Sequence, residues 1–563
     1  MFRISSTDIV EIWRVKGGLA ERNGGAPALS IYRAPSAKVS SERHASGIPI
    51  GFPKLPDISS QTYFQILRQW LGDCDNNHAG CCLETAEASP TRMPTRLIDV
   101  EGKDSRSVYL FETQHSQISQ VQHFRYVALS HPWGDKAEHS HYCTTRQNIT
   151  HHKAGLDIDT LPLTFKDAIR ATRGLGVRYL WIDSLCIIQG EGGDFEEEAK
   201  HMETVFSSAY CVIAATCAGG ASSGFLRSGS DRTVVKLEKP GEPPLYVCDS
   251  IDNFQRDVIE GTLNKRGWVL QERALARRTI YFAKNQTYWE CGEGVRCETL
   301  MKMRNNQAAL LGDPKFPKIA TDSSKGGRIR LYELLYKQYS KLQFTRSYDR
   351  PLAIAGLEQR LIRAFDTQGG YGVFTRYFGR GLLWQRDTTL APQIMKPIQF
   401  PKSQRYQVPS WSWMAYEGAI TFMDLPFGEI DWEDKEVRSP WSPPIPVSTL
   451  SLRPHHSSNA TWYTTNTREK IDLTVVARDF SASADNHIVY DGGERPTDQT
   501  VKCVIVGRRK MKAGVDARRI HYVLVIAQKR GAGRDAGYKR IGVGALPGSS
   551  ITLEEAGLQV QVF

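Results

Sequence analysis

The most constraining feature of the 563-residue chain is an alternation of short apolar runs and helical patterns between residues 125 and 218. The runs Arg125–Ser130, Val177–Asp183 and Tyr210–Ala215 have the length and composition of buried strands. Strand, helix, strand, helix, strand with short connections predicts right-handed crossovers and a parallel sheet covered on both faces. The sequence therefore predicts an α/β domain, with functional groups outside the carboxyl ends of its strands.

Two helices are expected between these strands. In the first, Thr164 followed by Asp167 resembles a capping box, and the helix is expected to stop at Gly174. In the second, Met202 and Phe206 share one apolar face, and the acidic residues before them complement the positive end of the helix dipole.

Length and composition limit the class of protein. A chain of 563 residues needs two or three packed units, and 40% hydrophobic with 24% charged residues is typical of globular proteins. No apolar stretch is long enough to cross a bilayer of about 30 Å, and the amino terminus lacks the apolar segment of a secretory signal. Because 11 cysteines show no disulfide-like spacing, we expect reduced thiols and an intracellular protein of the cytoplasm or nucleus.

The chain becomes richer in strand patterns after residue 264. Strands are expected at 279–283, 287–290, 471–477, 501–506, 521–526 and 538–543, with helices near 327–343 and 351–365.

The residues that follow the predicted strands are the candidates for a site. Ser130, Trp133 and Gly134 follow the first strand, where a hydroxyl, an indole and a bare backbone suit a nucleotide pocket; equally, Trp133 plugs the end of the sheet. Asp183 ends the most apolar strand, where an unpaired carboxylate is costly. It is therefore expected to cap a helix, pair with a cation or face a pocket, and the first two are favoured.

Two further residues lie just beyond Asp183. Cys186 has no adjacent base in the sequence, which favours a small buried hydrophobe over a catalytic nucleophile. Gln189 is the last residue of the same segment, and we include both as candidates for lining a pocket.

Cys74, His78, Cys81 and Cys82 fall within nine residues and include two types of zinc ligand. Structural zinc sites usually take two separated pairs of ligands, so this compact group favours packing at a helix end without a metal. No metal site is therefore predicted.

Two other groups of charged residues stand out. Arg266, Gln271, Glu272 and Arg273 flank Trp268 and are expected to form a polar network under the domain, with an interdomain latch as the functional alternative. Residues 501–540 carry twelve lysines and arginines against two aspartates. This charge allows contact with nucleic acid, but strand edges guarded by charged residues are the favoured interpretation.

Four consecutive segments resemble the heterokaryon incompatibility (HET) domain of fungal proteins in order and spacing. They are Tyr126–Gly134, Leu161–Ile169, Leu175–Gln189 and Met202–Ala209. The segment Leu263–Arg273 resembles the end of the same domain, and His131 stands where the family usually has an aromatic residue.

The resemblance implies a role in vegetative incompatibility, in which fused unlike cells undergo programmed cell death. We expect the domain to act by self-association or by contacts with a protein partner. The family is also thought to be distantly related to the TIR domain, a flavodoxin-like fold whose enzymatic members cleave NAD. An NAD- or nucleotide-cleaving enzyme is therefore the alternative, and nucleic-acid binding by the basic region is a weaker one.

Glu198 is the residue that the enzymatic alternative uses. It follows Phe195 and precedes Met202, an arrangement similar to the catalytic glutamate helix of NAD-cleaving TIR domains. Cleavage of a glycosidic bond needs a carboxylate near the ribose, and we name Glu198 and Asp183 as candidate catalytic residues. The competing interpretation is an acid-rich first helical turn.

These observations predict four segments. Residues 1–60 form a loose leader, 61–125 a lead-in helix and strand region, 126–272 the HET domain, and 273–563 a mixed α+β, strand-rich carboxyl-terminal region. The HET domain is expected to have a flavodoxin-like, TIR-like parallel sheet.

Overall fold

The computed structural model of the chain divides into two compact units, Met1–Phe316 and Pro317–Phe563, and each is described by itself. It describes residues 2–3, 9–10, 12–15, 18–21, 28–33, 48–81, 93–102, 105–113, 125–227, 232–303, 324–389, 394–401, 407–441, 471–481, 486–497, 499–510, 519–529 and 537–563.

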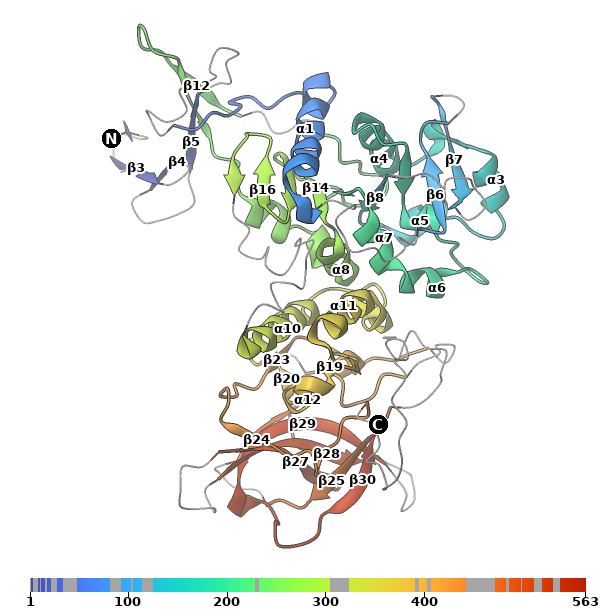
Figure 1. The fold of residues 1–563 in the computed structure, drawn as a ribbon, viewed down its shortest axis with the longest axis vertical. Coiled ribbons are helices and arrows are strands. Elements are labelled where there is room, and N and C mark those ends of the chain that lie inside the picture. Colours follow the sequence, from blue (N-terminus) through green and yellow to red (C-terminus); the bar gives the residue numbers. More distant parts are fainter. Residues whose placement is uncertain are drawn as a thin grey trace. The chain divides into compact units, whose positions relative to one another are not determined.

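The first unit is built on a ten-stranded mixed sheet with a parallel centre (Figure 1). β8 (Tyr126–Ser130) lies between β10 (Tyr179–Trp181) and β11 (Cys211–Ala214), and β14 (Arg278–Phe282) lies beyond β11, all four parallel. In chain order this arrangement is 2-1-3-4, the order that begins a doubly wound, flavodoxin-like sheet. The predicted α/β class is therefore confirmed.

Antiparallel strands extend the sheet on both sides of this centre. β6 (Arg96–Asp99), β7 (Ser107–Glu112) and β9 (Leu156–Asp157) lie beyond β10, and β15 (Thr287–Cys291), β16 (Gly294–Cys297) and β17 (Lys302–Met303) lie beyond β14. The sheet thus continues past residue 272, because β14 adds to the parallel centre and β15 pairs with it.

Helices cover both faces of the parallel centre. α4 (Leu163–Gly174) lies in the connection from β8 to β10, and α7 (Met202–Ser208) in the connection from β10 to β11. Because the two connections run in opposite directions along the sheet, right-handed crossovers put them on opposite faces. α1 (Gln61–Asn77) packs beside α4, where Arg68 donates a hydrogen bond of 3.0 Å to the carbonyl of Gly174. Every residue of β8 and β11 is accordingly buried.

The start of α4 differs from the predicted capping box, and that prediction was wrong. Thr164 Oγ1 donates to the carbonyl of Gly220 at 2.8 Å, and Asp167 accepts a hydrogen bond of 2.7 Å from the backbone of Phe225. The helix begins after Pro162, which makes no side-chain cap. The two polar side chains instead satisfy the backbone of a loop that only the tertiary fold brings to this helix.

The segment predicted as a loose leader contains strands. β5 (Leu29–Arg33) pairs antiparallel with β13 (Leu245–Asp249), and β12 (Val234–Leu237) forms the edge beyond β13. Tyr32 is fully buried and donates a hydrogen bond of 2.6 Å to Asp252. Local composition did not predict β5, because its hydrogen-bond partners come from a distant part of the chain.

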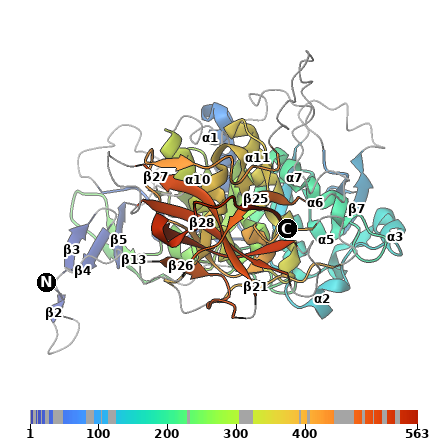
Figure 2. The same cartoon turned by 90° about the horizontal axis from the view of Figure 1, so that it is seen from below.

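The second unit combines helices with a seven-stranded sheet, as Figure 2 shows for β25 to β28. Its long helices are α10 (Lys325–Ser340) and α11 (Ala355–Phe365). Five strands pair in a closed ring: β27 (Val501–Arg509), β25 (Leu473–Arg478), β30 (Leu558–Val562), β29 (Tyr538–Pro547) and β28 (Ile520–Gln528), which returns to β27. The strand-rich, mixed α+β character predicted for this region is confirmed.

A buried ion pair lies in the second unit. Arg540 is about 1% exposed, and its Nε lies 3.1 Å from Asp491 Oδ2. The guanidinium also donates to the carbonyl of Leu382 at 2.9 Å and lies 3.2 Å from the ring centroid of Trp384. These contacts join β29 to the α12–β20 segment (Phe378–Leu382 and Trp384–Arg386).

We expect Arg540→Ala to lower the free energy of unfolding by about 3–5 kcal/mol, because it leaves the Asp491 carboxylate buried without its partner. The measurement is urea unfolding of the intact chain. Arg519→Ala is the matched control, because Arg519 pairs with the half-exposed Asp431 and should cost about 0–1 kcal/mol. Equal losses for the two variants would contradict this account.

Candidate site at the strand ends

The structure brings several predicted site residues together at the carboxyl ends of β8 and β10. Trp133 Nε1 donates a hydrogen bond of 2.6 Å to Asp183 Oδ2. Ser130, the last residue of β8, donates from its hydroxyl to Glu272 Oε2 of α8 (Gly267–Leu275) at 2.5 Å. Because β8 and β10 are parallel neighbours, their ends lie at the same edge of the sheet.

Gly134 permits a close approach between two loops at this edge. Its φ is +80°, and a Cβ on it would lie 2.9 Å from the Cα of Gly220 in the loop after β11. Any other residue would combine a strained backbone with a collision. Gly134 thus has a packing role between the loops that follow β8 and β11.

Two buried carboxyl groups dominate the electrostatics. Burial raises the pKa of Glu272 to about 7, although the hydrogen bond from Ser130 opposes the shift. Burial also raises the pKa of Asp183, against the stabilising effects of the Trp133 indole and of His139. Two acids whose ionisation is held back at one strand end make this edge a candidate functional site.

Two histidines stand beside Asp183. His131 Nδ1 lies 3.9 Å from Asp183 Oδ1, and the His139 ring stacks on Trp133 with centroids 4.1 Å apart. Burial lowers the pKa of His131 to about 3 and that of His139 to about 4, so both rings are neutral at pH 7. Within the described residues, neither ring nitrogen of either histidine has a hydrogen-bond partner, nor does the buried Ser184 hydroxyl.

These unpaired polar atoms are a further reason to treat this edge as a candidate site. A buried donor or acceptor without a partner costs roughly 1–3 kcal/mol, so five such atoms around one carboxylate are expensive for a packing element. Arg266 adds a cation at this edge and donates a hydrogen bond of 2.7 Å to the carbonyl of His131. The carboxyl group of Glu272, whose pKa burial raises to about 7, is able to exchange a proton, and the neutral imidazoles and Arg266 are able to bind a polar group.

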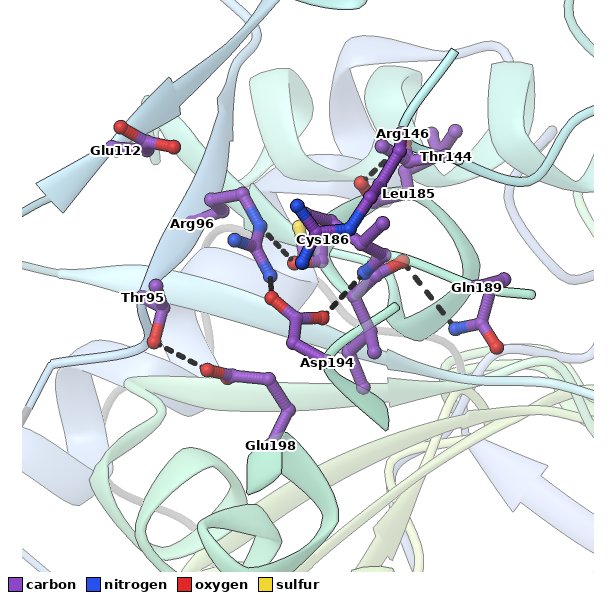
Figure 3. Close-up of polar contacts among 12 residues, drawn as sticks. Thr95, Arg96, Glu112, Thr144, Arg146, Leu185, Cys186, Gln189, Asp194 and Glu198 are labelled. Carbon is purple, nitrogen blue, oxygen red and sulfur yellow. Dashed lines mark hydrogen bonds and ion pairs between the residues drawn. The ribbon is translucent and has the colours of Figure 1, made fainter. Parts of the chain in front are cut away.

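The structure places Glu198 in a different group of contacts, which Figure 3 shows. Glu198 accepts a hydrogen bond of 2.6 Å from Thr95 Oγ1. Next to Thr95, Arg96 is ion-paired with Asp194 and donates at 2.7 Å to the carbonyl of Cys186. No hydrogen bond or ion pair among the described residues links Glu198 to Asp183, so the two candidate catalytic acids occupy separate networks.

Cys186 and Gln189 lie on the side of the Arg96 network. Cys186 is fully buried in α5 (Asp183–Cys186), and burial raises the pKa of its thiol to about 12. This suits the interpretation as a small buried hydrophobe, because a nucleophile needs the thiolate. Gln189 donates to the carbonyl of Ile187 at 3.4 Å and is half-buried.

The sequence named Glu272 and Arg266 but did not place them at the strand ends. They were expected in a polar network under the domain, a description that suits Arg273, whose guanidinium is buried and bonded to Glu290 at 3.0 Å and to Tyr281. Successive residues of α8 point in different directions, so Glu272 reaches Ser130 while Arg273 reaches β15. No sequence pattern indicated that His139 belongs to this site; it only lies eight residues after His131.

Comparison with known proteins finds a family match for the part of the chain that contains this site. Residues 126–272 match the family model described as heterokaryon incompatibility protein (HET), with the bounds that the sequence motifs predicted. The chain therefore contains a HET domain, and its two ends supply Ser130 and Glu272. No curated protein and no solved structure matches the chain significantly.

The raised pKa of Glu272 predicts a dependence of stability on pH. A carboxyl group whose pKa rises from 4.5 to about 7 on folding stabilises the fold fully below pH 4.5 and loses that contribution as the pH rises through 7. We expect wild-type protein to lose roughly 2–3 kcal/mol of unfolding free energy between pH 5 and pH 8 relative to Glu272→Gln.

Urea unfolding of both proteins across this pH range measures the difference. Other buried acids such as Glu298 and Glu358 also have raised pKa values, but they are present in both proteins and cancel. Parallel curves for the two proteins would show that Glu272 does not titrate in this range.

Proposed function

We propose that this chain is an effector of fungal non-self recognition, which restricts growth or kills the cell when it is active inside the cell. The observation that carries the proposal is the HET family match, which spans β8, β10 and β11 and ends within α8. The proposed mode of action is contact with a second copy of the chain or with a protein partner.

An edge strand inside the HET domain supports contact as the mode of action. β12 lies at the end of its sheet, and no described strand pairs with its outer edge. Val235 and Leu237 on β12 are 52% and 50% exposed and, being two residues apart, share one face. An exposed apolar edge strand is a template for pairing with another chain.

None of the helices in the described parts of the chain is long and apolar enough to cross a membrane.

Expression of the intact chain at high level in a fungal host tests the proposal. We expect growth to slow or stop, and Val235→Lys combined with Leu237→Lys to restore growth, because a charged edge resists strand pairing. The same double variant should weaken association of the purified chain by roughly tenfold or more in sedimentation experiments.

Leu334→Lys is the matched control, because Leu334 is 43% exposed on α10 in the other unit. The chain that carries this substitution should remain toxic. Circular dichroism checks that both variants fold. A harmless wild type, or full toxicity of the β12 double variant, would contradict the proposal.

Cleavage of NAD or a related nucleotide is the second candidate function, and the strand-end site favours it. A glycosidic cleavage uses a carboxylic acid with a raised pKa, and Glu272 has one beside Ser130. Glu198 remains the acid that the likeness to TIR domains points to, although it is bonded to Thr95.

If the chain cleaves NAD, we expect the NAD concentration in the cell to fall when the chain is expressed. Replacing the catalytic acid by glutamine should then abolish both the loss of NAD and the toxicity. Glu272→Gln and Glu198→Gln each keep the shape of the side chain and remove its charge, so comparing them identifies the acid. Toxicity with unchanged NAD in wild type and in both variants would exclude cleavage and leave the contact mechanism.

Part of the positive charge of residues 501–540 is paired with carboxylates, which bears on the weaker alternative of nucleic-acid binding. Five of these cations lie within 4 Å of a carboxylate. The pairs are Lys502 with Asp479, Arg508 with Glu433, Arg509 with Glu429, Arg519 with Asp431 and Arg540 with Asp491. Lys512, Arg518, Arg530 and Arg534 lie outside the described residues. The paired cations have less charge to offer a phosphate backbone.

A further inference from the structure

The fold brings a fourth metal-ligating side chain to the group of cysteines and histidine near residue 78. The ligand atoms of Cys74, His78, Cys81 and Cys291 all lie within 4.8 Å of one another. Cys291 comes from β15, more than two hundred residues further along the chain. Local spacing did not predict this set, and Cys82, which the sequence grouped with the other three, lies outside the described residues.

We propose that Cys74, His78, Cys81 and Cys291 bind a structural zinc ion. Three thiolates and one imidazole are a ligand set that tetrahedral zinc takes in structural sites. A Zn–S distance of about 2.3 Å and a Zn–N distance of about 2.0 Å place neighbouring ligand atoms of a tetrahedron roughly 3.5–3.8 Å apart. The distance from Cys291 Sγ to His78 Nδ1 is 3.5 Å, and since all the ligand atoms lie within 4.8 Å of one another, zinc binding would shorten the longest separation by about 1 Å at most.

The backbone holds the three local ligands on one side of the site. Cys74 lies in the last turn of α1, and the N–H of His78, which caps this helix, donates to the carbonyl of Cys74 at 3.0 Å. A 3-10 turn (Ala79–Cys81) then brings Cys81 back, with its N–H 2.8 Å from the carbonyl of His78. The helix end and the turn thus present three ligands to the end of β15.

Burial and charge around the group suit a thiolate-rich ion. Cys74, Cys81 and Cys291 are each at most 2% exposed, so a metal there is shielded from water. Zinc with three thiolates and a neutral imidazole has a net charge of −1, which nearby cations stabilise. The side chains of Arg277 and Arg278 are buried at this position and donate hydrogen bonds of 3.1 and 3.2 Å to the carbonyl of Cys81.

The ion would fasten the lead-in helix to the HET-domain sheet. α1 precedes the HET domain and β15 follows it, so one zinc ion closes a loop that includes the whole of residues 126–272. Binding energy at such a site is folding energy, because the unfolded chain does not keep the four ligands together. This inference concerns stability and stands apart from the proposed incompatibility function.

Metal analysis of the intact chain, purified without chelators under reducing conditions, tests the proposal. We expect about one zinc ion per chain, falling to less than about a tenth of an ion in Cys291→Ser. Cys217→Ser is the matched control, because Cys217 is a half-buried free cysteine in the same unit and is not one of the four ligands. This variant should contain as much zinc as the wild type.

Because loss of zinc is expected to destabilise the fold, a second variant keeps the test decisive. Cys81→His replaces one ligand type by another and should retain the metal. Cobalt(II) loaded into wild type should show the strong visible bands of a tetrahedral thiolate site, and Cys81→His should shift them.

Three outcomes would overturn the proposal: wild type without zinc after reconstitution, a Cys291→Ser protein with as much zinc as wild type, or a disulfide mapped between two of the three cysteines.

Discussion

The parallel pairing of β8 with β10 on one side and β11 on the other is the constraint on which the rest of the HET domain depends. A parallel neighbour cannot be reached by a tight turn, so each connection must cross the sheet with a helix and bury both of its faces. The same direction of all three strands gathers their carboxyl ends at one edge. Ser130 and Asp183 lie at the same edge for that reason, and ligands of such sheets bind where the strand order reverses.

The cost of burying polar groups explains why this edge differs from an ordinary sheet end. Asp183 keeps two hydrogen-bond donors, the Trp133 indole and the backbone of Ser184 at 2.7 Å, and the neutral His131 and His139 surround it. Glu272 receives one hydrogen bond from Ser130. Such a group is stable only if the rest of the domain holds it in place, as the apolar core around β8 does. By contrast, Glu198 is bonded to Thr95, and Arg96 is paired with Asp194, so structural pairing alone explains these groups.

Contacts between distant parts of the chain recur in both units. β5 is ordered by β13, Arg540 is neutralised by Asp491, and Cys291 joins the cysteines at the end of α1. In the first two cases a group that is unfavourable by itself, an exposed strand edge or a buried charge, is stabilised by its partner. A fold assembled in this way is cooperative, because the loss of one partner leaves the other group exposed to its full cost.

The sequence by itself determined the α/β class and the order of the strands and helices around Val177–Asp183, because hydrophobic periodicity and turn residues are local properties of the chain. The bounds of the HET domain came from the resemblance of its motifs to that family, and the family match has the same bounds. The sequence also named Ser130, Trp133 and Asp183, since polar residues after buried strands must lie at the sheet's edge. Only the tertiary structure decided that Glu272 contacts Ser130 while Glu198 contacts Thr95, that Thr164 and Asp167 bind a loop instead of capping a helix, and that Cys291 lies beside Cys74, His78 and Cys81. The physical reason is that side-chain partners are selected by proximity in space and by the cost of burial, and neither is encoded in the spacing of residues along the chain.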